Sequence, residues 1–186
     1  MSTIFMFINS MIENLRKIKY FYKEIGIKKL ITKILFYPFV KSRNKLLEKK
    51  IFKKKNSKDI FTEIYNTNYW NDKESKSGTG SSLKSTENIR LKLPLIIEKL
   101  NIKSIIDVPC GDFYWFSKII NDLNIEYLGG DIVEKIIFEN KKFASKKIEF
   151  KQLDIINDKL PYGELLICRD CLFHFSFEDI KLLLEP

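Results

Sequence analysis

Four acidic residues stand where apolar segments in the second half of the chain are expected to end: Asp107, Asp131, Asp154 and Asp170. In an open α/β sheet, ligands bind outside the carboxyl ends of the strands, so these residues should meet at one edge. Carboxylates accept hydrogen bonds from hydroxyl and amine groups and attract cations. A row of them disfavours a pyrophosphate. It favours a ligand that combines a positive charge, a ribose diol and an adenine amine.

The first of these acidic residues opens a tight turn. Residues 104–108 form a short buried-strand pattern, and Pro-Cys-Gly follows with Cys110 and Gly111. Asp112 comes next and is a good helix N-cap, which predicts a helix over 112–123. A strand that leads through a glycine turn into a helix N-terminus is a common place for a nucleotide-like ligand.

His174 is the only histidine, so any imidazole base must be this residue. A structural histidine near the start of a helix is the competing interpretation, and Asp170 is an alternative base. Arg169, at the end of the same predicted strand, is either a surface residue or a contact to cofactor or substrate.

The three cysteines allow a metal site on paper. Cys168, Cys171 and His174 follow one another at three-residue spacing, and Cys110 is expected on a neighbouring loop. Zinc would accept these four ligands. Because Cys168 ends a strand, buried cysteines of apolar character are the favoured interpretation, and we predict no metal.

Strand and helix patterns alternate along the second half of the chain. Helix spacing of apolar residues predicts a helix from Ser85 or Thr86, with Ile89, Leu93, Ile96, Ile97 and Leu100 as its buried stripe and a kink at Pro94. Strands are predicted over 104–108, 126–130, 148–153 and 165–168, and further helices over 133–143 and from Ser176 to Leu184. This order predicts an α/β, Rossmann-like, mainly parallel sheet with helices on both faces.

A Ser/Gly-rich loop at 75–82 precedes this alternation, after an aromatic stretch that runs from Phe61 to Trp70. The loop is either a flexible connector or a segment that wraps a ligand. It is not a phosphate-binding P-loop, because no Gly-Lys-Ser/Thr sequence closes it.

The positive charge of the chain is concentrated at its N-terminus. Residues 1–58 carry 16 basic and 3 acidic residues, a net charge of +13, whereas residues 59–186 carry 17 basic and 21 acidic residues, a net charge of −4. We therefore predict a basic helical segment at 1–58 and one Rossmann-like domain at 59–186. Residues 1–55 read as helical, either as a solvated face or as a peripheral membrane or partner contact.

Nothing in the sequence indicates a specific nucleic-acid partner, because the half expected to hold the site is acidic and arginine is scarce. Residues 1–12 lack the basic start and small-residue cleavage site of a signal peptide, and no apolar run approaches the ~20 residues of a membrane span. The sequence therefore predicts a cytoplasmic protein, with membrane-peripheral attachment through residues 1–55 as the alternative.

Residues 107–113, with Asp131, Asp154 and the segment 166–175, resemble the class I S-adenosylmethionine-dependent methyltransferases. In that family the first strand ends in an acidic residue and a glycine-rich turn, which Asp107 and Gly111 match. Pro109 and Phe113 stand where the family usually has glycine. The resemblance covers about residues 60–186.

The resemblance implies S-adenosylmethionine as cofactor and gives the candidate residues roles. Asp131 would take both ribose hydroxyls, Asp107 with the Cys110-Gly111 backbone would lie near the amino acid moiety, and Asp154 would take the adenine amine with Ile155 under the ring. The upstream stretch resembles a bacterial subgroup in which it closes over the cofactor, which adds Trp70 and Gly80. Arg169 would contact cofactor or substrate, with His174 and Asp170 as the candidate catalytic residues.

The family's sheet normally has seven strands, whereas the sequence predicts four, so the chain is expected to lack the three C-terminal strands. The predicted function is methyl transfer to a small-molecule or sugar-like acceptor. The alternative is a truncated module with weak or no activity that acts through its basic helices as a binding or membrane-surface protein.

Overall fold

The computed structural model describes residues 42, 44–54 and 56–184. The chain divides into two compact units, Met1–Lys50 and Ile51–Pro186, and the second unit holds the sheet. The helix predicted over 1–55 and its charged surface lie mostly outside the described residues. Within that range the structure describes residues 42 and 44–54, of which 42 and 44–51 are helical. No helix in the described part is both long and apolar enough to cross a membrane.

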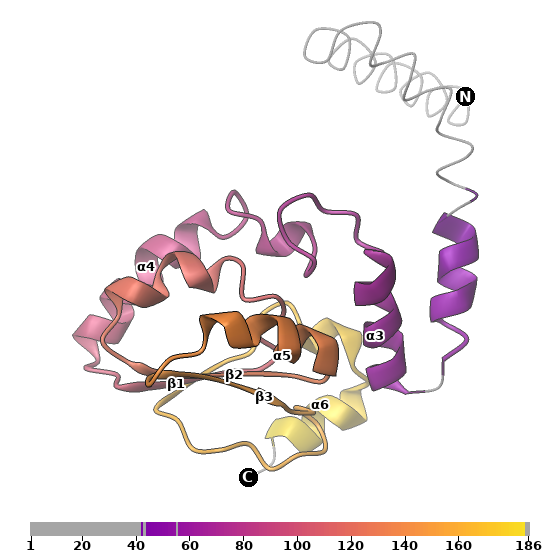
Figure 1. Ribbon diagram of the computed structural model, residues 1–186. Coiled ribbons are helices and arrows are strands. Elements are labelled where there is room, and N and C mark those ends of the chain that lie inside the picture. The colour runs from indigo at the N-terminus through magenta and orange to yellow at the C-terminus, as the bar shows by residue number, and fades with distance from the viewer. Residues whose placement is uncertain (1–41, 43, 55, 185–186) are drawn as a thin grey trace, which may run out of the picture. The chain divides into compact units, whose positions relative to one another are not determined.

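The described part of the second unit contains a four-stranded parallel sheet with strand order β3-β2-β1-β4. The strands are β1 (Ser104–Asp107), β2 (Glu126–Asp131), β3 (Ile148–Gln152) and β4 (Leu165–Ile167). The α/β, Rossmann-like fold that the sequence predicts is confirmed, and each strand begins at the predicted residue. Because all four strands run in the same direction, their carboxyl ends share one edge (Figure 1).

Helices and 3₁₀ turns connect and cover the strands. The α-helices are α3 (Ser57–Thr67), α4 (Glu87–Lys99), α5 (Glu134–Asn140) and α6 (Phe177–Leu184). The 3₁₀ turns are η1 (Thr79–Ser81), η2 (Phe116–Lys118), η3 (Ile120–Asp122), η4 (Lys141–Phe143) and η5 (Leu172–His174). The start of α6 is as predicted, since Ser176 Oγ accepts a hydrogen bond of 3.1 Å from the Asp179 amide.

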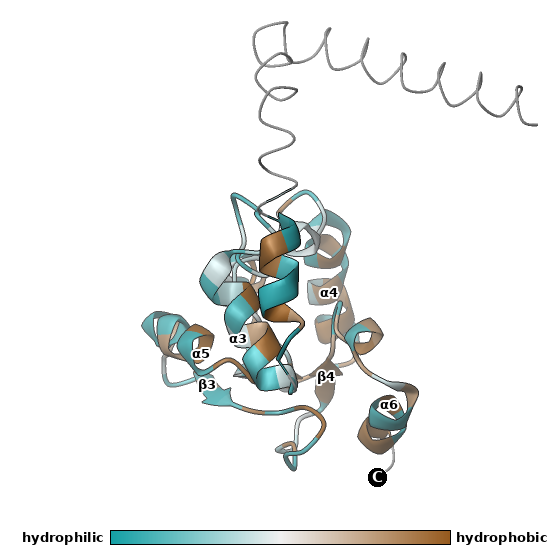
Figure 2. Ribbon diagram, turned by 90° about the vertical axis from the view of Figure 1, so that its right-hand side faces the viewer, coloured by the Kyte–Doolittle hydropathy of each residue, from teal (hydrophilic) through white to brown (hydrophobic). Residues whose placement is uncertain are grey.

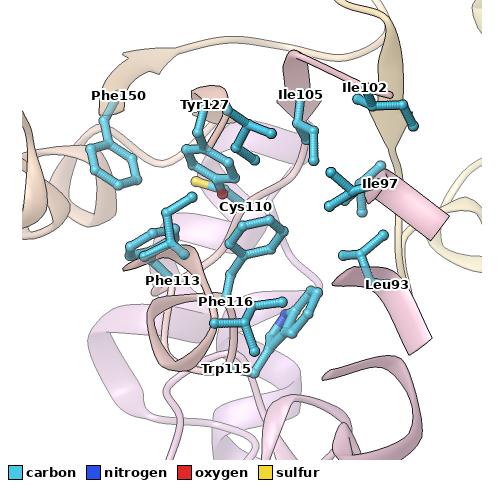
Figure 3. Close-up of a cluster of buried hydrophobic side chains, with 14 of the residues drawn as sticks. Leu93, Ile97, Ile102, Ile105, Cys110, Phe113, Trp115, Phe116, Tyr127 and Phe150 are labelled. Atoms are coloured by element: carbon cyan, nitrogen blue, oxygen red, sulfur yellow. The ribbon is translucent and has the colours of Figure 1, made fainter. Parts of the chain in front are cut away.

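An aromatic core fills one face of the sheet. Phe113 lies 5.1 Å from Tyr127 and 5.0 Å from Phe150, measured between ring centroids, and it stacks on Phe116 at 5.9 Å. Figure 3 shows these rings with Leu93 and Ile97 of α4. Each large buried ring removes apolar surface from water, so this cluster supplies much of the stabilisation of the fold.

The opposite face of the sheet has a smaller apolar core. Ile106, Val108 and Leu128 pack there with Ile155 and Cys171, and residues of the 153–160 segment and Leu183 of α6 lie against them. Side chains alternate between the two faces along a strand, which sends Ile105 to the aromatic core and Ile106 to this one. Helices therefore lie on both faces, as predicted.

The helix predicted over 112–123 is wrong. Phe113 has φ +58°, a left-handed conformation that an α-helix cannot contain, and the segment forms the two short turns η2 and η3. The Phe113 ring is buried, so the tertiary core fixes the backbone here against the local helix signal.

The stripe predicted for α4 is partly wrong. Leu93 and Ile97 are buried, but Ile96 and Leu100 are exposed. Thr86 precedes the helix, yet its hydroxyl donates to the Ser82 carbonyl oxygen at 2.8 Å and makes no cap bond to the helix.

Candidate functional site

A cavity of about 250 Å³ opens at the carboxyl edge of the sheet. All of the residues that the sequence analysis selected line it: Trp70, Gly80, Asp107, Cys110, Gly111, Asp131, Asp154, Ile155, Arg169, Asp170 and His174. They come from segments up to 104 residues apart, and the parallel topology is what brings them together. Their placement is a structural finding, and their roles stay predictions.

Asp107 lies at the end of β1 and is 3% exposed. Its Oδ2 accepts a hydrogen bond of 2.7 Å from the Tyr127 hydroxyl. Burial raises the pKa of the Asp107 carboxyl to about 7, although the Tyr127 hydrogen bond and the Arg169 charge oppose the rise. The structure thus holds a carboxyl that changes charge near neutral pH on the wall of the cavity.

Asp131 lies at the end of β2 and is equally buried. Its two oxygens accept backbone hydrogen bonds, Oδ2 from Gly111 at 3.1 Å and Oδ1 from Val133 at 2.9 Å. Burial raises the pKa of this carboxyl to about 6, against the lowering effect of the two amides. The bond to Gly111 ties the end of β2 to the turn after β1.

These two raised pKa values predict that the protein without ligand is more stable at mildly acidic pH. A carboxyl with a raised folded-state pKa contributes stability that is fully present below its unfolded value of 3.8 and is lost as the pH rises through the folded value. When the pH falls from 8 to 5.5, protonation of the two groups should raise the free energy of unfolding by about 2–3 kcal/mol.

Urea unfolding at pH 5.5 and pH 8 checks this expectation. The matched variant Asp107→Asn cannot titrate at that position, so its difference in stability between the two pH values should be smaller than that of the unmodified chain. An equal difference in both proteins would show that Asp107 does not have a raised pKa.

The turn between β1 and η2 is shaped for close backbone approach. Gly111 has φ +56°, and a Cβ at this position would overlap Ser77 Oγ. The Cys110 amide donates to the Gly130 carbonyl at 2.7 Å, and Asn140 Nδ2 donates to the Gly111 carbonyl at 2.8 Å. The turn that the sequence predicts is therefore held from both sides, with its backbone on the cavity wall.

The loop at 75–81 packs onto this turn. Asp112 Oδ1 accepts from Ser75 Oγ at 3.0 Å, and its Oδ2 accepts from the Lys76 amide at 2.7 Å. Ser77 Oγ lies 3.0 Å from the Tyr65 hydroxyl and accepts from the Asp112 amide at 2.9 Å. Of the two interpretations of the Ser/Gly stretch, the structure favours a loop packed on the site, because residues 77–81 line the cavity.

Arg169 holds the other end of this loop. One guanidinium nitrogen donates to both the Gly80 carbonyl and Ser81 Oγ at 3.0 Å, and the other donates to Asp170 Oδ2 at 2.6 Å. The guanidinium lies 5.5 Å from the centroid of the Trp115 ring. Arg169 is thus a contact between the loop and the β4 end, and not a free surface residue.

Replacing Arg169 by Met should release the 75–81 loop from the β4 end. The two hydrogen bonds from this charged donor to the loop are lost together with the one to Asp170, which should reduce stability by about 1–3 kcal/mol and speed amide hydrogen exchange at Gly80 and Ser81. Hydrogen-exchange mass spectrometry measures the second effect directly. Lys84→Met removes an exposed charge nearby and serves as the control. Equal exchange in both variants would contradict the anchoring role.

Asp154 and Ile155 lie at the β3 end of the cavity. Asp154 Oδ1 accepts from the Ile156 amide at 3.0 Å, and its Oδ2 accepts from Asn157 Nδ2 at 2.8 Å, so the residue also shapes the turn after β3. Ile155 is buried beside it. A carboxylate and a buried aliphatic side chain that line the same end of a cavity can take a flat heterocycle with an amine at its edge.

His174 and Asp170 lie at the opposite, β4 end. The His174 ring is 5.5 Å from the Phe61 ring and 4.2 Å from the Phe173 ring. Partial burial lowers the pKa of the imidazole, and the charge of Asp170 opposes that shift. This shift favours the neutral imidazole, the form that can accept a proton.

The four residues that zinc would accept do not form a metal site. Among the described residues no group of three or more His, Cys, Asp or Glu side chains is arranged to hold a metal ion. All three cysteines are free thiols, and Cys110 and Cys171 are buried.

Sequence reasoning missed much of the cavity wall. Nine further lining residues with aromatic or hydroxyl side chains are Ser57, Phe61, Tyr65, Ser77, Thr79, Ser81, Trp115, Phe173 and Phe175. The aromatic stretch before Trp70, the loop at 75–82 and the segment 166–175 contain most of them, but sequence reasoning assigned these residues no individual role. No protein-family model matches the chain, and no curated protein matches it.

Proposed function

We propose that this protein transfers a methyl group from S-adenosylmethionine to a small-molecule acceptor. One observation supports this most: two buried carboxyls, Asp107 and Asp131, end adjacent parallel strands beside a glycine turn and line the same cavity. Buried carboxyls are energetically unfavourable unless they have partners, and residues of this kind cluster at functional sites.

The charge of the site discriminates between cofactor classes. A pyrophosphate would meet Asp107, Asp131 and Asp154, all of which line the cavity, and like charges repel. A ligand with a sulfonium, an α-amino group and a ribose diol offers cationic or hydrogen-donating groups to these carboxylates. These three carboxylates therefore fit S-adenosylmethionine better than a dinucleotide.

Each residue of the site then has a specific binding task. Asp131, already fixed by the Gly111 and Val133 amides, is oriented to accept from the ribose hydroxyls. Asp107 and the backbone at Cys110 and Gly111 would contact the amino acid moiety. Asp154 would take the adenine amine, with Ile155 under the ring. Trp70 and Gly80 would cover the ligand from the 75–81 loop side.

The bound cofactor supplies an electrophilic methyl group on a sulfonium. The protein's contribution to the rate is to align the acceptor with that methyl group and to exclude water, since proximity and orientation can provide most of the acceleration. Arg169 contributes by holding the 75–81 loop over the cavity.

Isothermal titration of the full chain tests the proposal. S-adenosylmethionine and S-adenosylhomocysteine should both bind at one site per chain, and NAD should bind far more weakly because of its pyrophosphate. If the folded protein binds neither adenosyl ligand, the proposed function is wrong.

A further inference from the structure

Helix α3 extends along the carboxyl edge of the sheet from the β4 side to the α5 side. Near its middle, Phe61 meets the His174 ring of η5 at 5.5 Å. Near its end, Asn66 Oδ1 accepts from Lys135 Nζ of α5 at 3.1 Å. In Figure 2 α3 lies in front of the sheet edge, with α5 and β3 on one side and β4 on the other. The helix thus forms one wall of the cavity.

The cavity has two ends of different character. In the strand order β3-β2-β1-β4, Asp154 and Asp131 belong to the β3–β2 end. The residues after β4 belong to the other end, which is lined by Ser57, Phe61, Arg169, Asp170, Cys171, Phe173, His174 and Phe175. Three of these eight side chains are phenyl rings, and Ser57, Asp170 and His174 can form hydrogen bonds, so the lining suits a flat ring that carries a hydroxyl group.

Phe173 is the most unusual member of this group. Its side chain is 72% exposed although it lines the cavity. Its ring lies 4.2 Å from that of His174, and His174 in turn meets Phe61 edge to face at 85°. Exposed aromatic rings grouped at a cavity mouth mark a surface that binds apolar ligands.

We propose that this aromatic end, formed by Phe61, Phe173, His174 and Phe175, binds the methyl acceptor, and that the acceptor is a planar aromatic molecule with a phenolic hydroxyl. The inference rests on the proposed function and narrows its acceptor, replacing the sugar-like alternative. Phenyl walls favour a flat ring through offset or edge-to-face contacts. The neutral His174 provides an acceptor for the hydroxyl proton.

The reaction balances with these groups. The phenolic oxygen gives its proton to a His174 nitrogen and forms a bond to the methyl carbon. The bond between that carbon and sulfur breaks, and its electron pair stays on sulfur, so the sulfonium becomes a neutral thioether. The imidazolium then returns the proton to solvent.

Calorimetric titration of the full chain with two probes tests the acceptor class. The probes are 2-naphthol and methyl α-glucoside, each with and without S-adenosylhomocysteine. 2-Naphthol should bind at least about tenfold more tightly than the glucoside. Phe61→Ala should weaken 2-naphthol binding by about 3- to 10-fold, the range expected for one aromatic contact.

Phe177→Ala is the matched control, because that ring is 89% exposed and does not line the cavity. It should leave 2-naphthol affinity unchanged. A glucoside that binds as well as 2-naphthol, or a 2-naphthol affinity that Phe61→Ala does not change, would overturn the aromatic subsite. Absence of S-adenosylhomocysteine binding, with 2-naphthol still bound as expected, would instead contradict methyl transfer and leave the subsite in place.

Discussion

Replacing Asp131 by Asn is expected to weaken S-adenosylhomocysteine binding by about 10- to 100-fold. The variant keeps the shape of the side chain but removes the negative charge and one acceptor oxygen. A charge-assisted pair of hydrogen bonds to a ribose diol contributes roughly 1.5–3 kcal/mol. The amide oxygen can still accept from either Gly111 or Val133, whereas the amide nitrogen cannot accept from the other, so one of these two backbone hydrogen bonds is lost as well. Isothermal titration gives the affinity of both proteins.

Asp122→Asn is the control for the Asp131 variant. Asp122 lies on η3, is exposed and does not line the cavity. Its replacement makes the same chemical change at a remote place and should leave the affinity unchanged. If folded Asp131→Asn protein binds as tightly as the unmodified chain, the ribose role of Asp131 is wrong.

Replacing Gly111 by Ala is expected to have a larger effect on binding, a loss of about 100-fold or more. The left-handed backbone at φ +56° disfavours any Cβ by about 1–2 kcal/mol. The added methyl would also overlap Ser77 Oγ, which the Asp112 amide and the Tyr65 hydroxyl both contact. The 75–81 loop must then move away from the turn, and displacement of a site by about 1 Å can cost 100-fold.

Thermal unfolding and titration together separate the effect of Gly111→Ala on stability from its effect on ligand binding. Asn101→Ala is the matched control, since Asn101 is exposed and has nearly the same backbone conformation, with φ +53°. Both variants should lower the melting temperature by a few degrees, roughly 3–8 °C. Only Gly111→Ala should lose S-adenosylhomocysteine affinity. Retained affinity in Gly111→Ala would show that the loop does not need this close packing.

The strands and the acidic residues at their ends were predictable from the sequence. Short apolar runs such as Ile105-Ile106 favour buried strands because of their length and because turn residues follow them. Once the strands are parallel, topology alone brings Asp107 and Asp131 to one edge. That part of the site follows from local patterns and one global rule.

The 112–123 segment was not predictable, because its conformation depends on distant partners. Asp112 resembles a helix cap, but Ser75 and Lys76, 36 or more residues earlier, provide donors to its carboxylate. Phe113 adopts a left-handed conformation because its ring packs against Tyr127 and Phe150. No local window contains these contacts.

The aromatic end of the cavity was hidden for the same reason. Phe61 and His174 are 113 residues apart in the sequence, and each reads locally as part of an ordinary helix or turn. Their contact becomes visible only when α3 is placed along the sheet edge (Figure 1). The sequence carries no local signal for this contact, because it depends on tertiary packing.

A crystal structure of the full chain with S-adenosylhomocysteine tests the central claim most directly. We expect the ribose hydroxyls within hydrogen-bond distance of the Asp131 carboxylate, the adenine amine at Asp154 and the amino acid moiety beside Asp107 and Gly111. The sulfur should point toward the aromatic end at His174. A ligand bound outside this cavity, or bound in it with the ribose away from Asp131, would contradict the account.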